Sequence, residues 1–132
     1  MFRKPRYFSV VFGGEHYRVH PVDGGVYGHD PNFVGSSGIR AGDVLLLYCC
    51  GTYPGYGQEV PGFGVVTSIE TDGIHYQYFP ICHPVSWSIV QASIPEYQKT
   101  GNINWSLKGN FLREISSSSF RAVIAGRQVD WP

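Results

Sequence analysis

The chain has 132 residues, of which 42% are apolar and 15% aromatic, so it is long enough for one domain with a buried core and too apolar for a disordered segment. Ten Lys and Arg balance ten Asp and Glu, which excludes a protein that binds nucleic acid through an overall positive charge. No apolar run approaches the ~18 residues that cross a bilayer as a helix, so we expect a single domain over residues 1–132 and no membrane partner.

Short runs rich in Val, Ile, Tyr and Phe, separated by Gly, Pro, Asp and Ser, are typical of the strands of a small barrel or sandwich. In chain order, we expect strands at "YFSVVF" (7–12), "HYRVH" (16–20), "DVLLLYCC" (43–50), "FGVVTSI" (63–69), "IHYQYF" (74–79) and "NFLREI" (110–115). The "GGE" after the first run has the length of a hairpin connection, and Asp72-Gly73 predicts a tight turn. The run 43–50 is apolar on both alternating faces, which predicts a central strand that is covered on both sides and paired with 62–70.

Two helices are expected beside these strands. In "SSSSFRAVIAGR" the serines can cap a helix, and Phe120, Val123 and Ile124 share one helical face, which predicts a helix over 117–125. A second helix fits 88–98, although Pro95 limits it. The sequence therefore predicts an α+β fold that is mainly β, with short peripheral helices.

Catalytic and metal-binding patterns are weak in this sequence. His16 and His20 are four residues apart, but in a strand that spacing spans ~13 Å, too far for one shared metal ion. Cys49 and Cys50 are neighbours in an expected strand and should point to opposite faces. No glycine-rich phosphate loop and no GxSxG motif occurs. We therefore expect no catalytic residue, no metal and no cofactor, and a protein that is not an enzyme.

The cysteines and the N-terminal residues indicate the cellular compartment in which the protein works. Cys49, Cys50 and Cys82 are an odd and sparse set, typical of buried thiols in a reducing environment. In "MFRKPRYFSVVFGGEH", charges and glycines interrupt the apolar run too early for a secretory signal. We expect a cytoplasmic protein.

Aromatic residues are the more informative class. Many lie beside Gly, Pro, Asn or Ser, where burial is not automatic: Tyr27, Phe33, Tyr53, Tyr56, Trp87 and Trp105. Any one of these rings is an ordinary cap of a small barrel. A set of rings gathered at one barrel mouth would stack on a flat base, at about 1–3 kcal/mol each, and could enclose a methyl group.

The order of segments resembles one family of small barrels. An early strand is followed by a Gly-aromatic-Gly element ("GVYG", 25–28), a Gly-Asp that opens a long apolar strand ("AGDVLLLYCCG", 41–51), a glycine-rich strand ("GFGVV", 62–66) and a closing strand and helix ("GNFLREISSSSFRAVIAG", 109–126). This series resembles the PUA-like superfamily, especially its EVE domain, and the related YTH domains share the layout. Tyr27 stands where EVE domains usually carry Trp.

The resemblance implies a pseudo-barrel with helices on its rim and a pocket for one flipped nucleobase, in many relatives a modified one. It implies that Tyr27 lines the pocket wall, that Asn32 and Phe33 lie at the pocket edge, and that His29 or Asn32 reads the edge of the base. These domains are binding modules and not catalysts.

Further rings and amides follow from the same resemblance. Tyr76 or Tyr78 lies where YTH domains place a caging tryptophan, and we expect one of the two to face the pocket. Trp105 resembles a later ring-bearing segment, and Asn102 or Asn104 could offer amide contacts to a base. Tyr53 completes the candidate ligand-binding set.

The expected function is therefore a binding module for DNA or RNA that carries a modified base. Because flipping a base costs a few kcal/mol, contacts to a methyl or similar group would favour the modified base. Two alternatives stay open. One is a small hydrolase of modified nucleosides, as in the ASCH branch of the superfamily, although its GxKxxExR-like signature is not found here. The other is an adaptor that contacts a protein partner through the tyrosine-rich loop 52–61.

Overall fold

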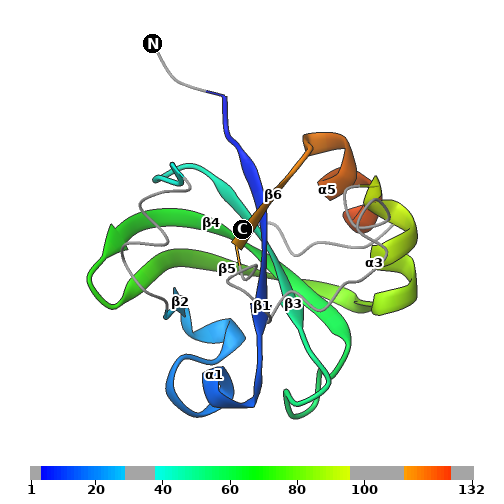
Figure 1. Ribbon diagram of the computed structural model, residues 1–132, viewed down its shortest axis with the longest axis horizontal. Coiled ribbons are helices and arrows are strands. Elements are labelled where there is room, and N and C mark those ends of the chain that lie inside the picture. Colours follow the sequence, from blue (N-terminus) through cyan, green and yellow to red (C-terminus); the bar gives the residue numbers. More distant parts are fainter. Residues whose placement is uncertain (1–3, 29–37, 96–111, 126–132) are drawn as a thin grey trace.

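The computed structural model of this chain describes residues 4–28, 38–95 and 112–125, except for the side chain of His16. Its elements in chain order are β1 (Tyr7–Phe12), α1 (Gly14–Val19), the 3-10 turn η1 (Val22–Gly24), β2 (Val26–Tyr27), β3 (Val44–Cys49), β4 (Glu59–Glu70), β5 (Gly73–Ser86), α3 (Trp87–Ser93), β6 (Leu112–Ile115) and α5 (Ser117–Ile124). The strands form one sheet in the order β2-β5-β4-β3-β1-β6. Figure 1 shows this sheet curled into a half-barrel with short helices around it, so the fold is mainly β, as predicted.

The curl of the sheet brings its two sides together. Three strands separate β2 from β1 in the sheet, yet the Tyr27 hydroxyl in β2 donates a hydrogen bond to the Val11 carbonyl oxygen in β1, at 3.0 Å. The ring of Tyr27 also lies 5.0 Å from that of Phe12, edge to face. These contacts place Tyr27 across the concave side of the half-barrel.

The sheet is covered on both faces. The inner cluster, on the concave face, consists of Phe8, Val10, Phe12, Val22, Tyr27, Ile39, Leu45, Leu47, Cys49, Tyr53, Val66, Ile74, Tyr76 and Leu112. The outer cluster consists of Val11, Val44, Leu46, Val60, Phe63, Phe79, Ile81, Val85, Val90, Ile94, Ile115 and Val123, and it includes residues of α3 and α5.

Strand β3 shows why the sequence folds in this way. Leu45 and Leu47 face the inner cluster, whereas Val44 and Leu46 face the outer cluster, because successive side chains of a strand point to opposite faces. Each fully buried Leu contributes about 1.5–3 kcal/mol. The prediction of a central strand covered on both sides and paired with residues 62–70 is confirmed, since β3 lies between β1 and β4.

The hairpin and the helix over 117–125 are also confirmed, and the helix expected around 88–98 is confirmed as far as Ser93. β4 and β5 are antiparallel neighbours joined at Thr71 and Asp72, one residue before the predicted Asp72-Gly73. Helix α5 begins at Ser117, and the side chain of Ser116 accepts a hydrogen bond from the Ser119 N–H at 3.0 Å. Helix α3 ends at Ser93, because Ile94 precedes a proline and is extended.

The expected strand at 16–20 is wrong, and so is its hairpin with 7–12. Residues Gly14–Val19 form α1, while β1 pairs in parallel with β3 and antiparallel with β6. Five alternating residues are too few to fix a strand, and two distant strands occupy the edges of β1 instead. Because this segment is a helix and not a strand, the expected separation of ~13 Å between His16 and His20 does not apply.

Within the described ranges, no helix is both long and apolar enough to cross a membrane.

Candidate functional site

The glycines around Tyr27 pack this element against its own chain. The Tyr76 N–H donates to the Gly25 carbonyl oxygen at 2.9 Å, and a Cβ at Gly25 would lie 3.0 Å from the Tyr76 carbonyl oxygen. A Cβ at Gly28 would lie 2.8 Å from the ring of His20. The Gly-aromatic-Gly element thus lets β2 approach β5 and the segment after α1, and it brings Tyr27 onto the concave face.

Tyr27 itself is completely enclosed in this structure. Its exposed fraction is 0%, its hydroxyl is bonded to Val11, and burial raises its pKa well above the usual range. The ring is therefore a neutral, fully packed part of the inner cluster.

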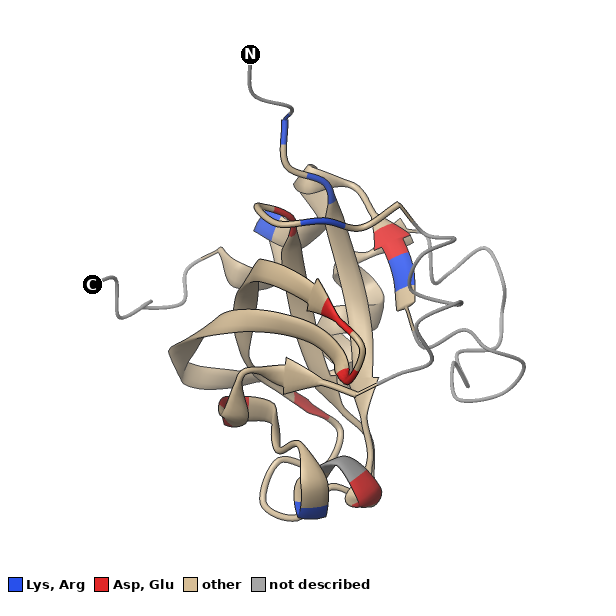
Figure 2. Cartoon of the chain, turned by 90° about the vertical axis from the view of Figure 1, so that its left-hand side faces the viewer, with Lys and Arg blue, Asp and Glu red and all other residues tan. Residues whose placement is uncertain are grey.

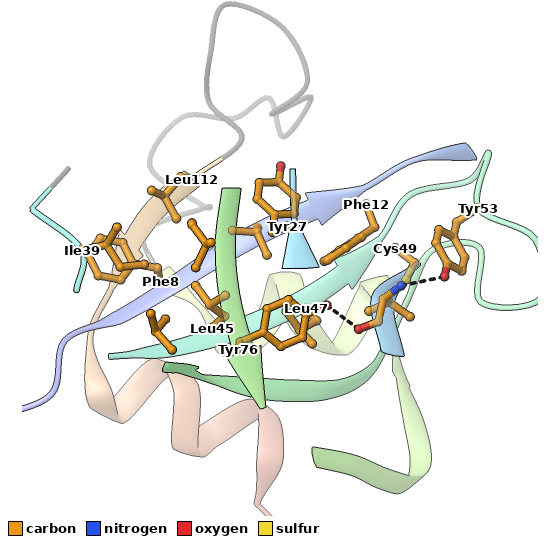
Figure 3. Close-up of a cluster of buried hydrophobic side chains, with 14 residues drawn as sticks. Phe8, Phe12, Tyr27, Ile39, Leu45, Leu47, Cys49, Tyr53, Tyr76 and Leu112 are labelled. Carbon is orange, nitrogen blue, oxygen red and sulfur yellow. Dashed lines mark hydrogen bonds between the residues drawn. The ribbon is translucent and has the colours of Figure 1, made fainter. Parts of the chain in front are cut away.

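Tyr53 and Tyr76 hold the backbone of one residue between them. The Val22 N–H donates to the Tyr53 hydroxyl oxygen at 3.0 Å, and the Tyr76 hydroxyl donates to the Val22 carbonyl oxygen, as the dashed lines in Figure 3 show. Both hydroxyls are buried, so these bonds satisfy the polar groups of η1. Figure 3 shows the rings of Tyr27, Tyr53 and Tyr76 within the same cluster.

Tyr78 is the half-buried residue among the tyrosines predicted to form the site. It packs against the inner cluster, as Tyr76 does, so the expectation that only one of the two faces inward is wrong. Residues two apart in a strand share a face. The Tyr78 hydroxyl lies 3.4 Å from the Pro61 carbonyl oxygen, a long bond. Tyr78 therefore keeps both accessible ring surface and a weakly engaged hydroxyl.

The phenols of this site stay protonated at neutral pH. Burial is the largest cause that raises the pKa of Tyr53, Tyr76 and Tyr78. Tyr53 and Tyr76 are buried and bonded to Val22, so of these three residues only the half-buried Tyr78 offers ring surface for stacking on an uncharged ligand.

Two further tyrosines extend the rings toward the surface. Tyr17 meets Tyr53 edge to face at 5.4 Å, and Tyr56 is stacked with Tyr53 at 6.4 Å. Tyr17 is 50% exposed and Tyr56 39% exposed. Sequence reasoning did not select Tyr17, because it assigned that residue to a strand, whereas helix α1 presents it to the loop between β3 and β4.

A hydrogen-bonded pair of polar side chains, His75 and Asp72, lies near Gly28. The His75 Nε2 and Asp72 Oδ1 atoms are 2.7 Å apart, and this hydrogen bond is the main reason why the pKa of Asp72 is lowered. His20, whose ring faces Gly28, also favours the charged form of Asp72. The ring of His20 and the backbone of Asp72 thus lie beside Gly28, the residue that precedes His29 in the sequence.

The other predicted site residues lie outside the described part of the chain. They are His29, Asn32, Phe33, Asn104 and Trp105, together with the alternative Asn102.

The cysteines give little support to nucleophilic chemistry. Cys49 belongs to the inner cluster and Cys50 packs against the outer cluster, so the predicted opposite directions are confirmed. Burial raises the pKa of the Cys49 thiol, and the Cys50 sulfur lies 3.2 Å from the Thr52 hydroxyl. Among the described residues, no three His, Cys, Asp or Glu side chains are grouped as metal ligands.

Neither a family model nor a curated protein matches this sequence. Solved structures share its fold, and the following three are examples. The solution structure of Rpa0253 from Rhodopseudomonas palustris has a TM-score of 0.59 and 13% identity, over 89% of this chain and 90% of that one. The crystal structure of Atu2648 from Agrobacterium tumefaciens gives 0.54 and 12%, over 89% and 90%. A hypothetical protein from Leishmania major gives 0.55 and 10%, over 92% and 93%. At these identities the likeness concerns the fold alone.

Proposed function

We propose that this chain is a nucleic-acid-binding module of the PUA-like, EVE type that recognises a modified base flipped out of its strand. The observation that carries the proposal is the convergence of four tyrosines. Tyr27, Tyr53, Tyr76 and Tyr78 were selected from the sequence, come from three separate segments, and all pack at the inner cluster. A flat base stacks on an accessible ring, and Tyr78 keeps ring surface beside the three buried tyrosines.

Within this site the tyrosines have different roles. Tyr27, Tyr53 and Tyr76 have hydroxyls that are bonded to the backbone of the chain, so they support the wall. Tyr78 is half-buried and is the ring of the four best able to stack on the base. A ring stacked on a base contributes about 1–3 kcal/mol.

The test is calorimetric titration with methylated and unmethylated nucleosides, which carry no phosphate. Tyr78→Ala should weaken binding of the preferred methylated nucleoside by about tenfold or more, whereas Tyr78→Phe, which keeps the ring, should bind like the wild type. Tyr48→Ala is the matched control, because Tyr48 is also half-buried but packs on the outer cluster, 4.9 Å from the ring of Trp87. Equal nucleoside affinities of Tyr78→Ala and the wild type would reject the proposed site.

One observation favours the adaptor as a second candidate. Tyr17 and Tyr56 expose their rings beside Tyr53 at the loop between β3 and β4, and exposed tyrosines are common in protein interfaces. A photocrosslinking amino acid at position 56 should then capture one defined protein in cells. The same group at Ile89, which is exposed on α3, serves as the control.

A further inference from the structure

The charges of this electrically neutral chain are segregated in space. Among the described residues, Figure 2 shows most Lys and Arg at the end of the molecule where the chain begins, and most Asp and Glu elsewhere. We define the basic end by five residues near the start of β1: Lys4, Arg6, Arg40, Arg113 and Arg121. Asp43 joins the backbones of Arg6 and Arg40, Arg113 lies in β6 beside β1, and the ring of Phe120, the neighbour of Arg121, lies 5.1 Å from that of Tyr7. The five basic residues come from the residues before β1, the segment before β3, β6 and α5, so in the sequence only Lys4 and Arg6 lie close together.

The two carboxylates at this end are already engaged. Asp43 is 1% exposed, and it accepts hydrogen bonds from the backbone N–H groups of Arg6, at 2.9 Å, and Arg40, at 3.0 Å. Glu114 accepts two bonds from the Arg6 guanidinium, at 3.0 and 2.7 Å. Asp43 thus fixes the backbones of two basic residues side by side, while Glu114 pairs with the Arg6 guanidinium.

Three cations are left to face solvent. Lys4, Arg40 and Arg121 are exposed, and none of them forms an ion pair with a carboxylate in the described part of the chain. Arg121 donates a hydrogen bond to the Ser117 hydroxyl at 3.2 Å, which leaves its charge available. A cluster of exposed, unneutralised cations is complementary to a polyanion.

The basic end adjoins the inner cluster. The Arg6 guanidinium lies over the ring of Phe8, 5.0 Å from its centre, and Phe8 belongs to the inner cluster. Ile39, next to Arg40 in the sequence, belongs to it as well. Figure 3 shows Phe8 and Ile39 at the opposite end of the cluster from Tyr53.

We infer that the basic end binds backbone phosphates of the nucleic acid whose base is held on the concave face. This inference rests on the proposed function for the identity of the polyanion. Lys4, Arg40 and Arg121 make the phosphate contacts. The hydrogen bonds of Arg6 to Glu114 and Asp43 stabilise the basic end. The base provides selectivity and the three cations provide affinity without regard to sequence.

The experiment compares the triple variant Lys4→Gln, Arg40→Gln, Arg121→Gln with the wild type. The ligands are unmodified single-stranded DNA and RNA oligonucleotides of one sequence, titrated at several salt concentrations. Arg18→Gln is the control, because Arg18 is an exposed cation in α1 and not at the basic end. On single strands each phosphate contact contributes about 0.7 to the slope of log affinity against log salt. The triple variant should therefore lose a slope of about 2, whereas Arg18→Gln should keep the wild-type slope.

Several outcomes separate this inference from the proposed function. If the triple variant retains the wild-type slope, if Arg18→Gln loses as much, or if the wild type binds no oligonucleotide at low salt, the inference is overturned. If the slope changes as expected but methylated and unmethylated nucleosides bind equally, phosphate binding by the basic end is supported and recognition of a modified base is rejected. The triple variant should bind the preferred methylated nucleoside as the wild type does, since a nucleoside has no phosphate.

Discussion

Tyr27 is the residue to which the sequence resemblance gave the main role, and in the structure it is completely buried. The resemblance places it on the wall of a base pocket, and the structure shows its ring in the inner cluster and its hydroxyl bonded across the concave side to Val11. A wall residue of this kind shapes a site through its rigidity. Its substitution must therefore be analysed for stability before it is analysed for binding.

Tyr27→Phe should destabilise the fold by about 1–3 kcal/mol, because it leaves the Val11 carbonyl oxygen without its buried donor. Affinity per folded molecule for the preferred methylated nucleoside should stay within about twofold, since the ring is kept. Denaturant unfolding, followed by nucleoside titration of the folded fraction, measures both. An unchanged free energy of unfolding would mean that this hydrogen bond contributes nothing to closing the half-barrel.

Residue identities were predicted better than residue environments. The sequence selected Tyr53, Tyr76 and Tyr78, and the structure brings all three to one cluster. It did not reveal that Val22 joins the hydroxyls of Tyr53 and Tyr76. That contact depends on where η1 lies relative to β5, which is a long-range property that no local pattern encodes.

At the scale of elements, β2 has only two residues and depends on its fit to β5. Gly73, at the start of β5, makes that fit possible: a Cβ there would lie 2.1 Å from the Tyr27 carbonyl oxygen, and its φ of 140° is one that other residues rarely adopt. The approach of β2, and with it the position of Tyr27, requires glycine at this position.

Gly73→Ala should therefore destabilise the protein by more than about 3 kcal/mol, which combines backbone strain with displacement of β2. Gly55→Ala is the matched control, because Gly55 also has a positive φ, of 84°, but no atom within 4 Å of an added Cβ. It should cost only the backbone strain, about 1–2 kcal/mol. Equal losses in thermal or denaturant unfolding would show that the contact between β2 and β5 is not tight in solution.

The elements also show what a sequence pattern can and cannot give. Local signals were sufficient for β3, for the hairpin of β4 and β5 and for α5, because apolar runs, turn residues and serine caps act within a few residues. They failed at 16–20, where α1 forms, because the alternation was short and the partners of β1 are the distant strands β3 and β6. The pairing of β1 with β3 and β6 thus overrode the local alternation at 16–20, and α1 formed there instead of a strand.

At the scale of the whole molecule, a net charge of zero conceals an uneven distribution. The sequence supported a shallow salt dependence for nucleic-acid binding, since no overall positive charge exists. The structure gathers cations from distant segments at the basic end. The expected salt slope is therefore small but not zero, and it depends on Lys4, Arg40 and Arg121.

The buried tyrosines predict how stability depends on pH. Burial raises the pKa of Tyr27, Tyr53, Tyr76 and Tyr78 above the ordinary value of about 10. Above that pH the unfolded chain loses phenol protons that the folded chain keeps, so the free energy of unfolding falls as pH rises. It should be independent of these groups below about pH 9 and decrease above about pH 10. Tyrosinate absorbance from these residues should appear together with unfolding; its appearance in the folded protein near pH 10 would contradict their burial.

The central claim is that the concave face, lined by tyrosines, binds a modified base. Titration of isotope-labelled wild-type protein with a methylated nucleoside and its unmethylated counterpart, followed by backbone amide resonances, tests it most directly. We expect the methylated nucleoside to bind at least about tenfold more tightly, and its largest shifts to fall on Gly25–Gly28 and Tyr76–Tyr78, the backbone of β2 and β5 at the inner cluster. Equal affinities, or shifts confined to the exposed Tyr17 and Tyr56, would contradict it.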